Sequence, residues 1–191
     1  QETFDEIAKV AKSLGCATHI DGARIFNAAI ATGVEVSRMC EHYDSVSICF
    51  SKGLGAPVGS VLVGSSAFIA RAHRWRKMFG GGWRQAGLLA AACLHALDNH
   101  VDRLIDDHHR AQRIAKMLND LPMFTVDLDT VQTNMIYAET NGPASEVVEK
   151  YARHGVDMFD LSANRIRVVV HLHITDEDID RFEAISHELF G

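Results

Sequence analysis

The sequence predicts an α/β fold in which residues 1–100 form part of a mostly parallel sheet with helices, followed by a small α+β domain over residues 101–191. Short apolar runs such as "DSVSICFS" alternate with helical segments, which is typical of buried parallel strands. Beyond Pro122 the predicted segments become shorter, and strands and helices alternate at closer spacing. This change in the length and spacing of the predicted segments indicates a domain boundary near residue 100.

The first part begins with an amphipathic helix that ends at Gly15, and its apolar face consists of Phe4, Ile7, Ala8, Ala11 and Leu14. "CATHI" then predicts a strand that runs into a loop, "DGARIFNAA", at its carboxyl end. "EVSRMCEH" predicts a helix, and "DSVSICFS" and "GSVLVG" predict two further strands. "SSAFIARAHRWRKM" predicts a helix with Phe68, Ala72 and Trp75 on its inner side, and residues 86–121 predict two helices joined near 98–101.

The second part has four strand-like segments, "MFTVDL", "TNMIYAE", "VDMF" and "RIRVVVHLH". A helix from Pro143 to His154 ends at Gly155, and a final helix begins at Thr175 with acidic residues in its first turn. Because a parallel crossover needs a strand on both sides of its helix, a chain that opens in a helix lacks one partner. We therefore expect this chain to be the latter part of a longer fold.

The composition is that of a folded globular protein, with 47% hydrophobic and 23% charged residues. The net charge of −6 with interspersed signs argues against binding to nucleic acid or to anionic membranes. No apolar run approaches the roughly 18 residues that cross a bilayer, so a cytoplasmic protein is expected. The four cysteines form no CxxC pair, which favours free buried thiols over a disulfide or a zinc site.

Lys52 lies between an apolar strand and a glycine-rich turn, in "SICFSKGLGAPVGSVLVG". A solvated loop lysine is the simplest interpretation. The GxGxxxG spacing that begins at Gly53 resembles a dinucleotide-binding turn, but such a turn must open a helix. Here Pro57 forces extended geometry and a strand follows, and a Walker loop would place its lysine after the glycines.

A third interpretation makes Lys52 a nucleophilic amine that forms a Schiff base with an aldehyde, for which pyridoxal 5′-phosphate is the commonest partner. Such a site needs a carboxylate that keeps the pyridine nitrogen protonated. Asp21 ends the neighbouring strand, "CATHI", at the edge where the carboxyl ends of parallel strands meet. Asp21 and Lys52 together favour this interpretation more strongly than either residue alone.

Three ungapped segments, "HIDGARIFNAA", "SVSICFSKGLGAPVGSVLVG" and "RWRKMFGGGWRQAGLLAAA", resemble the low-specificity L-threonine aldolases. These are pyridoxal-phosphate enzymes of the aspartate-aminotransferase-like class. The resemblance extends from about residue 4 to the end, including "TNMIYAE" and "RIRVVVHLHIT". It implies that residues 1–100 are part of the large cofactor-binding domain of a transferase-like fold and that residues 101–191 are its small C-terminal domain.

The resemblance also implies roles for residues near the strand ends. Lys52 would hold the cofactor covalently, and Asp21 would pair with its pyridine nitrogen. Arg24 would contact the cofactor ring oxygen or the substrate carboxylate. Ser51 would assist the cofactor phosphate, although a serine at a strand end is equally suited to forming a local turn.

Further along the chain, Lys77 and Arg84 flank "MFGGGW" and resemble basic residues that approach a phosphate or carboxylate from a neighbouring subunit. A solvated pair beside a glycine loop is the alternative. Arg167 matches the arginine that holds the substrate carboxylate, a role suited to a planar bidentate donor. Arg165 points to the same face of a regular strand, so only the match of "IRVVVH" selects Arg167. His171 is matched as a residue near the substrate.

His171 and His173 form an HxH pair on one face of the expected strand, but no third ligand accompanies them, so no metal site is predicted. His173 is expected at the surface. His19 shares a strand face with Asp21, and support of that carboxylate and core packing are equally compatible with its position. The paired histidines of the central helix, His108 and His109, are expected to be solvated.

The resemblance implies cleavage of L-threonine, L-allo-threonine and related β-hydroxy-α-amino acids to glycine and an aldehyde, by a cytoplasmic homo-oligomer, either a dimer or a tetramer. The cofactor-binding residues that the family carries further upstream have no counterpart in residues 1–191, so this chain alone is expected to bind the cofactor poorly. Two alternatives stay open. One is a β-eliminating lyase on the same scaffold, and the other is a noncatalytic domain that keeps the fold for assembly.

Overall fold

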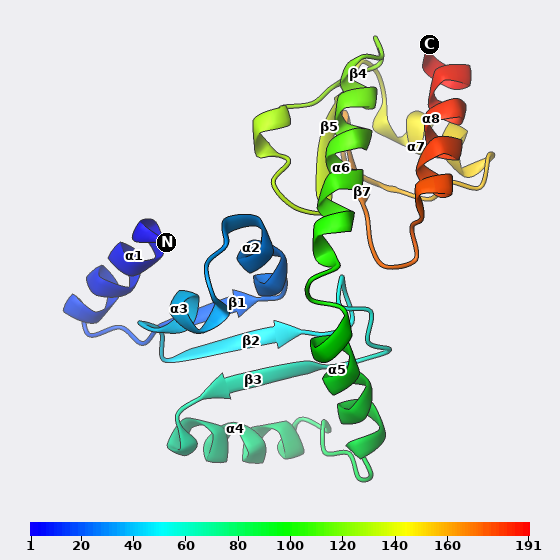
Figure 1. The fold of residues 1–191 in the computed structure, drawn as a ribbon. Helices are drawn as coiled ribbons and strands as arrows, with labels where there is room; N and C mark the ends of the chain where they lie inside the picture. Colours follow the sequence, from blue (N-terminus) through cyan, green and yellow to red (C-terminus); the bar gives the residue numbers. More distant parts are fainter. The chain divides into compact units, whose positions relative to one another are not determined.

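The computed structural model describes residues 1–191, and the chain divides into two compact units, Gln1–Asp102 and Arg103–Gly191. We call these the first and the second unit (Figure 1). None of the helices combines the length and the apolar character that a membrane span requires.

The first unit is an α/β unit built on one three-stranded sheet (Figure 1). The strand order is β1-β2-β3, with β1 parallel to β2 and β3 antiparallel to β2. The parallel pair confirms the prediction for the first two strands, whereas the antiparallel third strand departs from a mostly parallel sheet. The elements are α1 (Glu2–Ser13), β1 (His19–Gly22), α2 (Ile25–Thr32), α3 (Val36–Cys40), β2 (Ser45–Cys49), β3 (Ser60–Gly64), α4 (Ser66–Met78) and α5 (Gly87–Asn99).

A small core in the first unit joins the parallel pair of strands to the two helices that follow β1. Its buried members are Ile20, Ile25, Met39 and Val46, from β1, α2, α3 and β2. The helix α2 occupies most of the segment that the sequence analysis expected to be a loop. Its helix-forming alanines and the left-handed Gly33 at its C-cap, with φ of 68°, are the signals that indicate it. This core fixes the segment between the end of β1 and the start of β2.

Two helices of the first unit leave their expected inner faces exposed. Only Ala8 of α1 is buried, although Ile7 and Leu14 share the apolar face of that helix. In α4 no residue is buried, and Phe68 and Trp75, expected on its inner side, are both exposed. The periodicity located both helices correctly, but the expectation that these faces pack into a core is wrong within residues 1–191.

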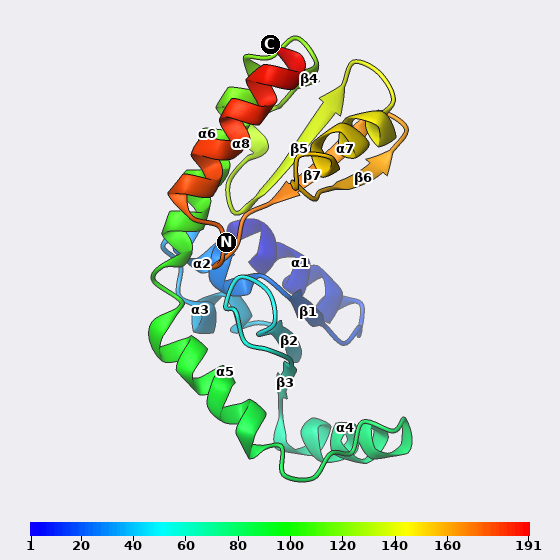
Figure 2. The same cartoon turned by 90° about the vertical axis from the view of Figure 1, so that its right-hand side faces the viewer.

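The second unit is an α+β unit with a four-stranded antiparallel sheet in the order β4-β5-β7-β6. Its helices α6, α7 and α8 cover one face of this sheet, and Figure 2 shows α6 and α8 side by side. The elements are α6 (Leu104–Asn119), β4 (Phe124–Thr125), a 3-10 turn (Leu128–Thr130), β5 (Met135–Thr140), α7 (Ala144–Ala152), β6 (Phe159–Ser162), β7 (Arg165–Val169) and α8 (Asp176–Phe190).

The second unit has the larger core, because alternate residues of β5 and β7 face the three helices. Ile136, Ala138 and Ile166 are fully buried. Tyr151 of α7 is also fully buried, and its hydroxyl lies 2.8 Å from the hydroxyl of Ser186 in α8. The opposite face of the sheet carries polar and charged side chains from the same strands.

Tyr151 gives the second unit a stability that depends on pH. Burial raises the pKa of Tyr151 to about 12, although the hydrogen bond with Ser186 acts in the opposite direction. An unfolded tyrosine ionises near pH 10, so the full contribution of Tyr151 to the free energy of unfolding is present below about pH 10. Between about pH 10 and the folded pKa of about 12, the free energy of unfolding falls by about 1.4 kcal/mol per pH unit. In urea unfolding at about pH 9 and about pH 11, Tyr151→Phe should show a smaller loss of stability than the wild type by about 1 kcal/mol. Equal losses in the two proteins would contradict this.

Candidate functional site

Asp21 lies in β1, at the carboxyl end of the strand. The parallel register pairs Asp21 with Ser47 of β2, so the carboxyl ends of both strands meet at one edge of the sheet. The Asp21 side chain is exposed, and its Oδ1 accepts a hydrogen bond of 3.1 Å from the backbone N–H of Ala23. The carboxylate is therefore held by its own turn and remains open to a ligand at this edge.

Gly22 allows β1 and β2 to approach closely next to Asp21. A Cβ atom at this position would lie 2.8 Å from the carbonyl oxygen of Ser47 and 2.9 Å from Cγ2 of Val46. Both distances are shorter than normal contacts, so any larger residue must push the two strands apart. The glycine thus fixes the spacing of the parallel pair that carries Asp21.

Replacing Gly22 with alanine should destabilise the protein by about 1–3 kcal/mol, because the backbone oxygen of Ser47 cannot move without disturbing the sheet. Gly87→Ala is the matched control, since a Cβ at Gly87 meets no atom within 4 Å and Gly87 begins α5. Urea denaturation of both variants measures the difference. Equal stabilities of the two variants would show that the close approach of the strands is unimportant.

Lys52 lies in the loop that follows β2, three residues after Cys49. The Lys52 side chain is exposed, whereas the neighbouring Phe50, Leu54 and Ala56 are buried and hold the loop against the unit. The backbone N–H of Gly55 donates to the carbonyl of Lys52 at 2.8 Å and closes a tight turn. A buried and hydrogen-bonded loop therefore presents one exposed amine at the same edge of the sheet as Asp21.

The Lys52 loop lowers the pKa of the Cys49 thiol at the end of β2. Burial acts to raise the pKa of the Cys49 thiol, but hydrogen bonds with Ser51 and Ser60 and the positive charge of Lys52 outweigh it, so the pKa is lowered. The Ser51 hydroxyl lies 3.4 Å from the Cys49 sulfur. The contact of Ser51 in this structure is thus a local one, and its expected role toward a phosphate remains a proposal.

Arg24 lies at the start of α2, three residues after Asp21. Its Nε is buried and has no hydrogen-bond partner, although buried N–H groups are nearly always paired. No side chain caps the first turn of α2, so the positive end of that helix adds to the charge of the guanidinium. Asp21 and Arg24 both line a pocket of about 320 Å³ between β1, α2 and α1.

Arg165 and Arg167, which spacing could not separate, differ in the structure. Both belong to β7 on the open face of the second sheet, but Arg165 forms an ion pair and a hydrogen bond with Glu139 of β5. Arg167 pairs with Tyr137 in register, its guanidinium lies 5.4 Å from the Phe159 ring, and its Nε is buried without a partner. Of the two, Arg167 is the one whose charge is not already neutralised.

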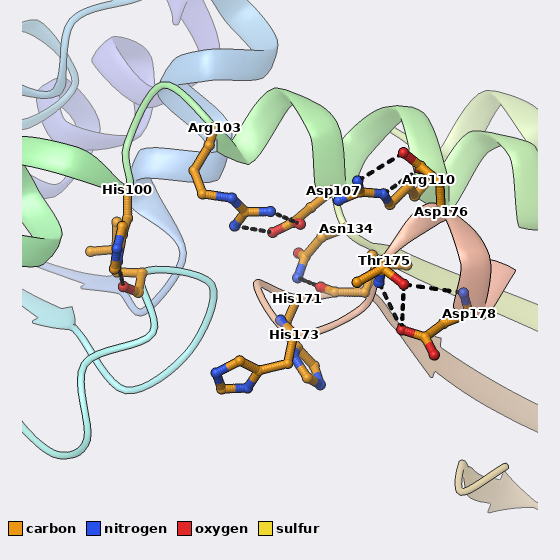
Figure 3. Close-up of polar contacts among 12 residues, drawn as sticks. His100, Arg103, Asp107, Arg110, Asn134, His171, His173, Thr175, Asp176 and Asp178 are labelled. Atoms are coloured by element: carbon orange, nitrogen blue, oxygen red, sulfur yellow. Dashed lines mark hydrogen bonds and ion pairs between the residues drawn. The ribbon is translucent and has the colours of Figure 1, made fainter. Parts of the chain in front are cut away.

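His171 and His173 lie in the turn after β7, because β7 ends at Val169 (Figure 3). The expectation of an HxH pair on one strand face is therefore wrong. The His171 Nδ1 accepts a hydrogen bond of 3.3 Å from the backbone N–H of His173, and the two rings lie edge to face. Asn134 ends the ladder here, since its buried side-chain amide donates to the carbonyl of Val170 at 2.7 Å. This pairing fixes the point at which His171 leaves the sheet.

Other predicted residues make contacts away from the Asp21 and Lys52 edge. Lys77 and Arg84 lie exposed at either end of the glycine loop after α4, and no hydrogen bond or ion pair joins them to Asp21 or Lys52. His19 Nδ1 lies 2.9 Å from the hydroxyl of Ser45, across the β1–β2 pair, and does not contact the Asp21 carboxylate. In the second unit His109 of α6 is exposed as expected, but His108 is buried on the inner face of α6, so the expectation that it is solvated is wrong.

Sequence reasoning missed two side chains that act on the candidate residues. His100 contacts the backbone of the Lys52 loop at Leu54, and Phe159 stacks on Arg167. Phe159 ends the predicted strand "VDMF" and His100 lies at the predicted join between two helices, but neither position suggests a contact with a candidate residue. Both contacts depend on strand register or on chain segments that are distant in sequence, and no local signal could have found them.

The chain is similar in sequence to a known protein family and to several named enzymes. A family model described as "Beta-eliminating lyase" matches residues 1–141. The chain is 42% identical over 182 residues to low-specificity L-threonine aldolase 1 of Arabidopsis thaliana, covering 93% of this chain and 51% of the relative. It is 40% identical over 184 residues to the low specificity L-threonine aldolase of Escherichia coli K12, covering 96% and 54%.

A solved structure is similar to this chain in its fold. A candidate aromatic amino acid beta-eliminating lyase/threonine aldolase from Exiguobacterium sp. 255-15 superposes with a TM-score of 0.83 at 21% identity, covering 98% of this chain and 56% of that protein. The chain thus spans about half the length of the proteins it matches. Because the family model covers most of residues 1–191, the chain belongs to the beta-eliminating lyase family.

Proposed function

We propose that this chain belongs to a pyridoxal-phosphate-dependent aldolase that cleaves L-threonine, L-allo-threonine and related β-hydroxy-α-amino acids to glycine and an aldehyde. The observation that carries the proposal is the parallel pairing of β1 and β2, which brings Asp21 and the Lys52 loop to one edge of the sheet. In α/β sheets, ligands bind at the carboxyl ends of parallel strands. The relatives named as low-specificity L-threonine aldolases supply the reaction class.

The residues at this edge fit an anionic aldehyde cofactor. Lys52 presents an exposed amine, Asp21 presents an exposed carboxylate, and Arg24 has a buried Nε without a partner beside a pocket. Amine, carboxylate and guanidinium are the groups that a carbonyl, a pyridine nitrogen and an anionic oxygen require. Ser51, in the same loop, is offered as a further contact for the phosphate.

Pyridoxal phosphate, when bound, supplies an electron sink for cleavage of the substrate Cα–Cβ bond. The protein's own contribution is position and charge. Lys52 would hold the cofactor covalently through its exposed amine. Asp21 keeps a proton on the ring nitrogen, because a carboxylate beside that nitrogen favours its charged form. Arg24 orients an anionic oxygen at the start of α2.

Arg167 is proposed to bind the substrate carboxylate, with His171 nearby. Its planar guanidinium offers two parallel N–H groups, the geometry that a carboxylate accepts. Its unpartnered buried Nε supports this assignment over Arg165, whose charge is taken up by Glu139.

Arg167→Lys should raise the KM for the amino acid roughly 10- to 100-fold with a smaller change in kcat, because a lysine loses the bidentate contact. Arg165→Lys is the matched control on the same strand face and should change KM by less than about threefold. Steady-state kinetics of both variants in the intact protein measures the difference. A larger effect at Arg165 than at Arg167 would reverse the assignment.

The protein is further proposed to be a cytoplasmic homo-oligomer, a dimer or a tetramer. Support comes from the exposed apolar residues around the glycine loop after α4, where Phe79 and Trp83 are 83% and 66% exposed. Lys77 and Arg84 flank the same loop, which suits a role toward an anion in a neighbouring subunit. Sedimentation analysis of the intact protein tests this, and a monomer at micromolar concentration would contradict it.

β-Elimination is the second candidate activity, favoured by the description of the matching family model. The two activities differ in their products. Incubation of the intact protein with L-threonine should yield glycine and acetaldehyde, whereas β-elimination from aromatic or sulfur amino acids would yield pyruvate and ammonia. Pyruvate release without glycine would replace the aldolase with the lyase.

A further inference from the structure

The turn that carries Lys52 depends on one peptide group, the one between Leu54 and Gly55. The N–H of this peptide, on Gly55, donates to the Lys52 carbonyl at 2.8 Å. Gly55 has φ of 70°, a conformation that glycine adopts without strain. The orientation of the Leu54–Gly55 peptide therefore determines whether the Lys52 carbonyl is held.

The other end of the same peptide is held by His100. Its ring Nδ1 lies 2.7 Å from the carbonyl oxygen of Leu54, 46 residues away in the sequence (Figure 3). Leu54 is only 4% exposed, so its carbonyl would lack a partner without this bond or a water molecule. His100 thus completes a chain of contacts that runs from its ring through the Leu54–Gly55 peptide to Lys52.

The position of His100 is itself fixed. It follows the last residue of α5, and its backbone N–H donates to the carbonyl of Ala96 at 2.9 Å. Its ring packs edge to face against His95 with centroids 5.2 Å apart. A carbonyl oxygen can only accept, so the proton on His100 must lie at Nδ1. The helix end, the neighbouring ring and the required tautomer together aim a single donor at the Lys52 loop.

We infer that His100 is a positioning residue that holds Lys52 in place for its reaction with the cofactor aldehyde. The inference rests on the proposed function of Lys52. It requires a donor at the Nδ1 position and nothing else from the ring. A backbone that is fixed before the aldehyde arrives keeps the amine near its reacting geometry, which speeds covalent capture.

Two substitutions separate the two ring nitrogens. The amide nitrogen of asparagine can take the place of Nδ1, whereas that of glutamine extends to the place of Nε2. His100→Asn should therefore behave like the wild type, and His100→Gln should lose the bond to Leu54. His154→Gln is the matched control, since the His154 Nδ1 also lies within hydrogen-bond distance of a backbone carbonyl, that of Lys150 at 3.0 Å in the second unit.

The test uses the intact protein and two measurements. The first is hydrogen exchange of the peptide covering residues 50–58 without cofactor. The second is the rate at which pyridoxal 5′-phosphate labels Lys52, trapped with borohydride and read by mass spectrometry. For His100→Gln we expect exchange at Gly55 and Ala56 to be roughly three- to tenfold faster and labelling to be slower by a similar factor. His100→Asn and His154→Gln should stay within about twofold of the wild type.

Unchanged exchange and labelling in His100→Gln would overturn the inference, and so would equal impairment of the asparagine and glutamine variants. Peptides from the second unit report whether each variant is folded. If the wild-type protein itself carries no label on Lys52, the proposed function fails instead. The exchange measurement still decides whether His100 holds the loop, because it needs no cofactor.

Discussion

Replacing Lys52 with alanine should lower the rate of threonine cleavage by at least about 1,000-fold. The Lys52 side chain does not pack into its loop, because it is exposed while Phe50, Leu54 and Ala56 are buried, and the turn is closed by the Lys52 backbone carbonyl, which alanine keeps. The variant should therefore fold normally and lose only the amine. The measurement is the rate of glycine formation from L-threonine by the intact protein.

Lys116→Ala serves as the control for Lys52, since Lys116 is an exposed lysine of α6 in the second unit. It should retain full activity. Adding a small primary amine to Lys52→Ala should restore part of the rate, because the missing group is a nucleophile and not a structural contact. A Lys52→Ala protein with more than a tenth of the wild-type rate would contradict the proposed role of this residue.

The second large effect is expected at Asp21. Asp21→Asn should lower kcat roughly 100- to 1,000-fold with little change in KM, because the amide removes the charge that favours a protonated ring nitrogen. The asparagine Oδ1 can still accept the hydrogen bond from the N–H of Ala23, so the turn after β1 should be preserved. The substitution therefore separates charge from local structure.

Asp21→Ala removes the charge and also the bond to Ala23, and provides the comparison for Asp21→Asn. If the charge is what matters, the two variants should show similar kcat values and differ mainly in stability, which urea denaturation measures. A fully active Asp21→Asn protein would exclude a carboxylate requirement. The pairing of β1 with β2 would then be a feature of the fold, and Asp21 would have no role toward the cofactor ring nitrogen.

Much of the fold follows from local patterns. The β-branched run that contains Val46 predicted β2, and the polar residues at the strand ends identified Asp21 and Lys52 as candidate site residues. The final helix begins at Thr175 as its capping sequence predicts, with Thr175 and Asp178 exchanging hydrogen bonds (Figure 3). These features are encoded within a few residues, so a single sequence suffices to find them.

The features that local patterns missed depend on tertiary packing. The α2 segment was expected to be a loop, but the helix-forming "IFNAAIAT" is a helix that packs Ile25 into a core with Ile20 and Val46. The choice between Arg165 and Arg167 needed the register with β5, which places Glu139 beside Arg165. The contact between His100 and Leu54 joins a helix end to a loop 46 residues away, which no periodicity reports.

The most direct test of the central claim is borohydride reduction of the intact protein in the presence of pyridoxal 5′-phosphate, followed by peptide mapping. We expect a single pyridoxyl label on Lys52, in the peptide that contains Gly53 and Leu54. Asp21→Asn should still be labelled, and Lys52→Ala should not. Absence of the label from Lys52, or its presence on Lys77 instead, would contradict the assignment of Lys52 as the residue that holds the cofactor.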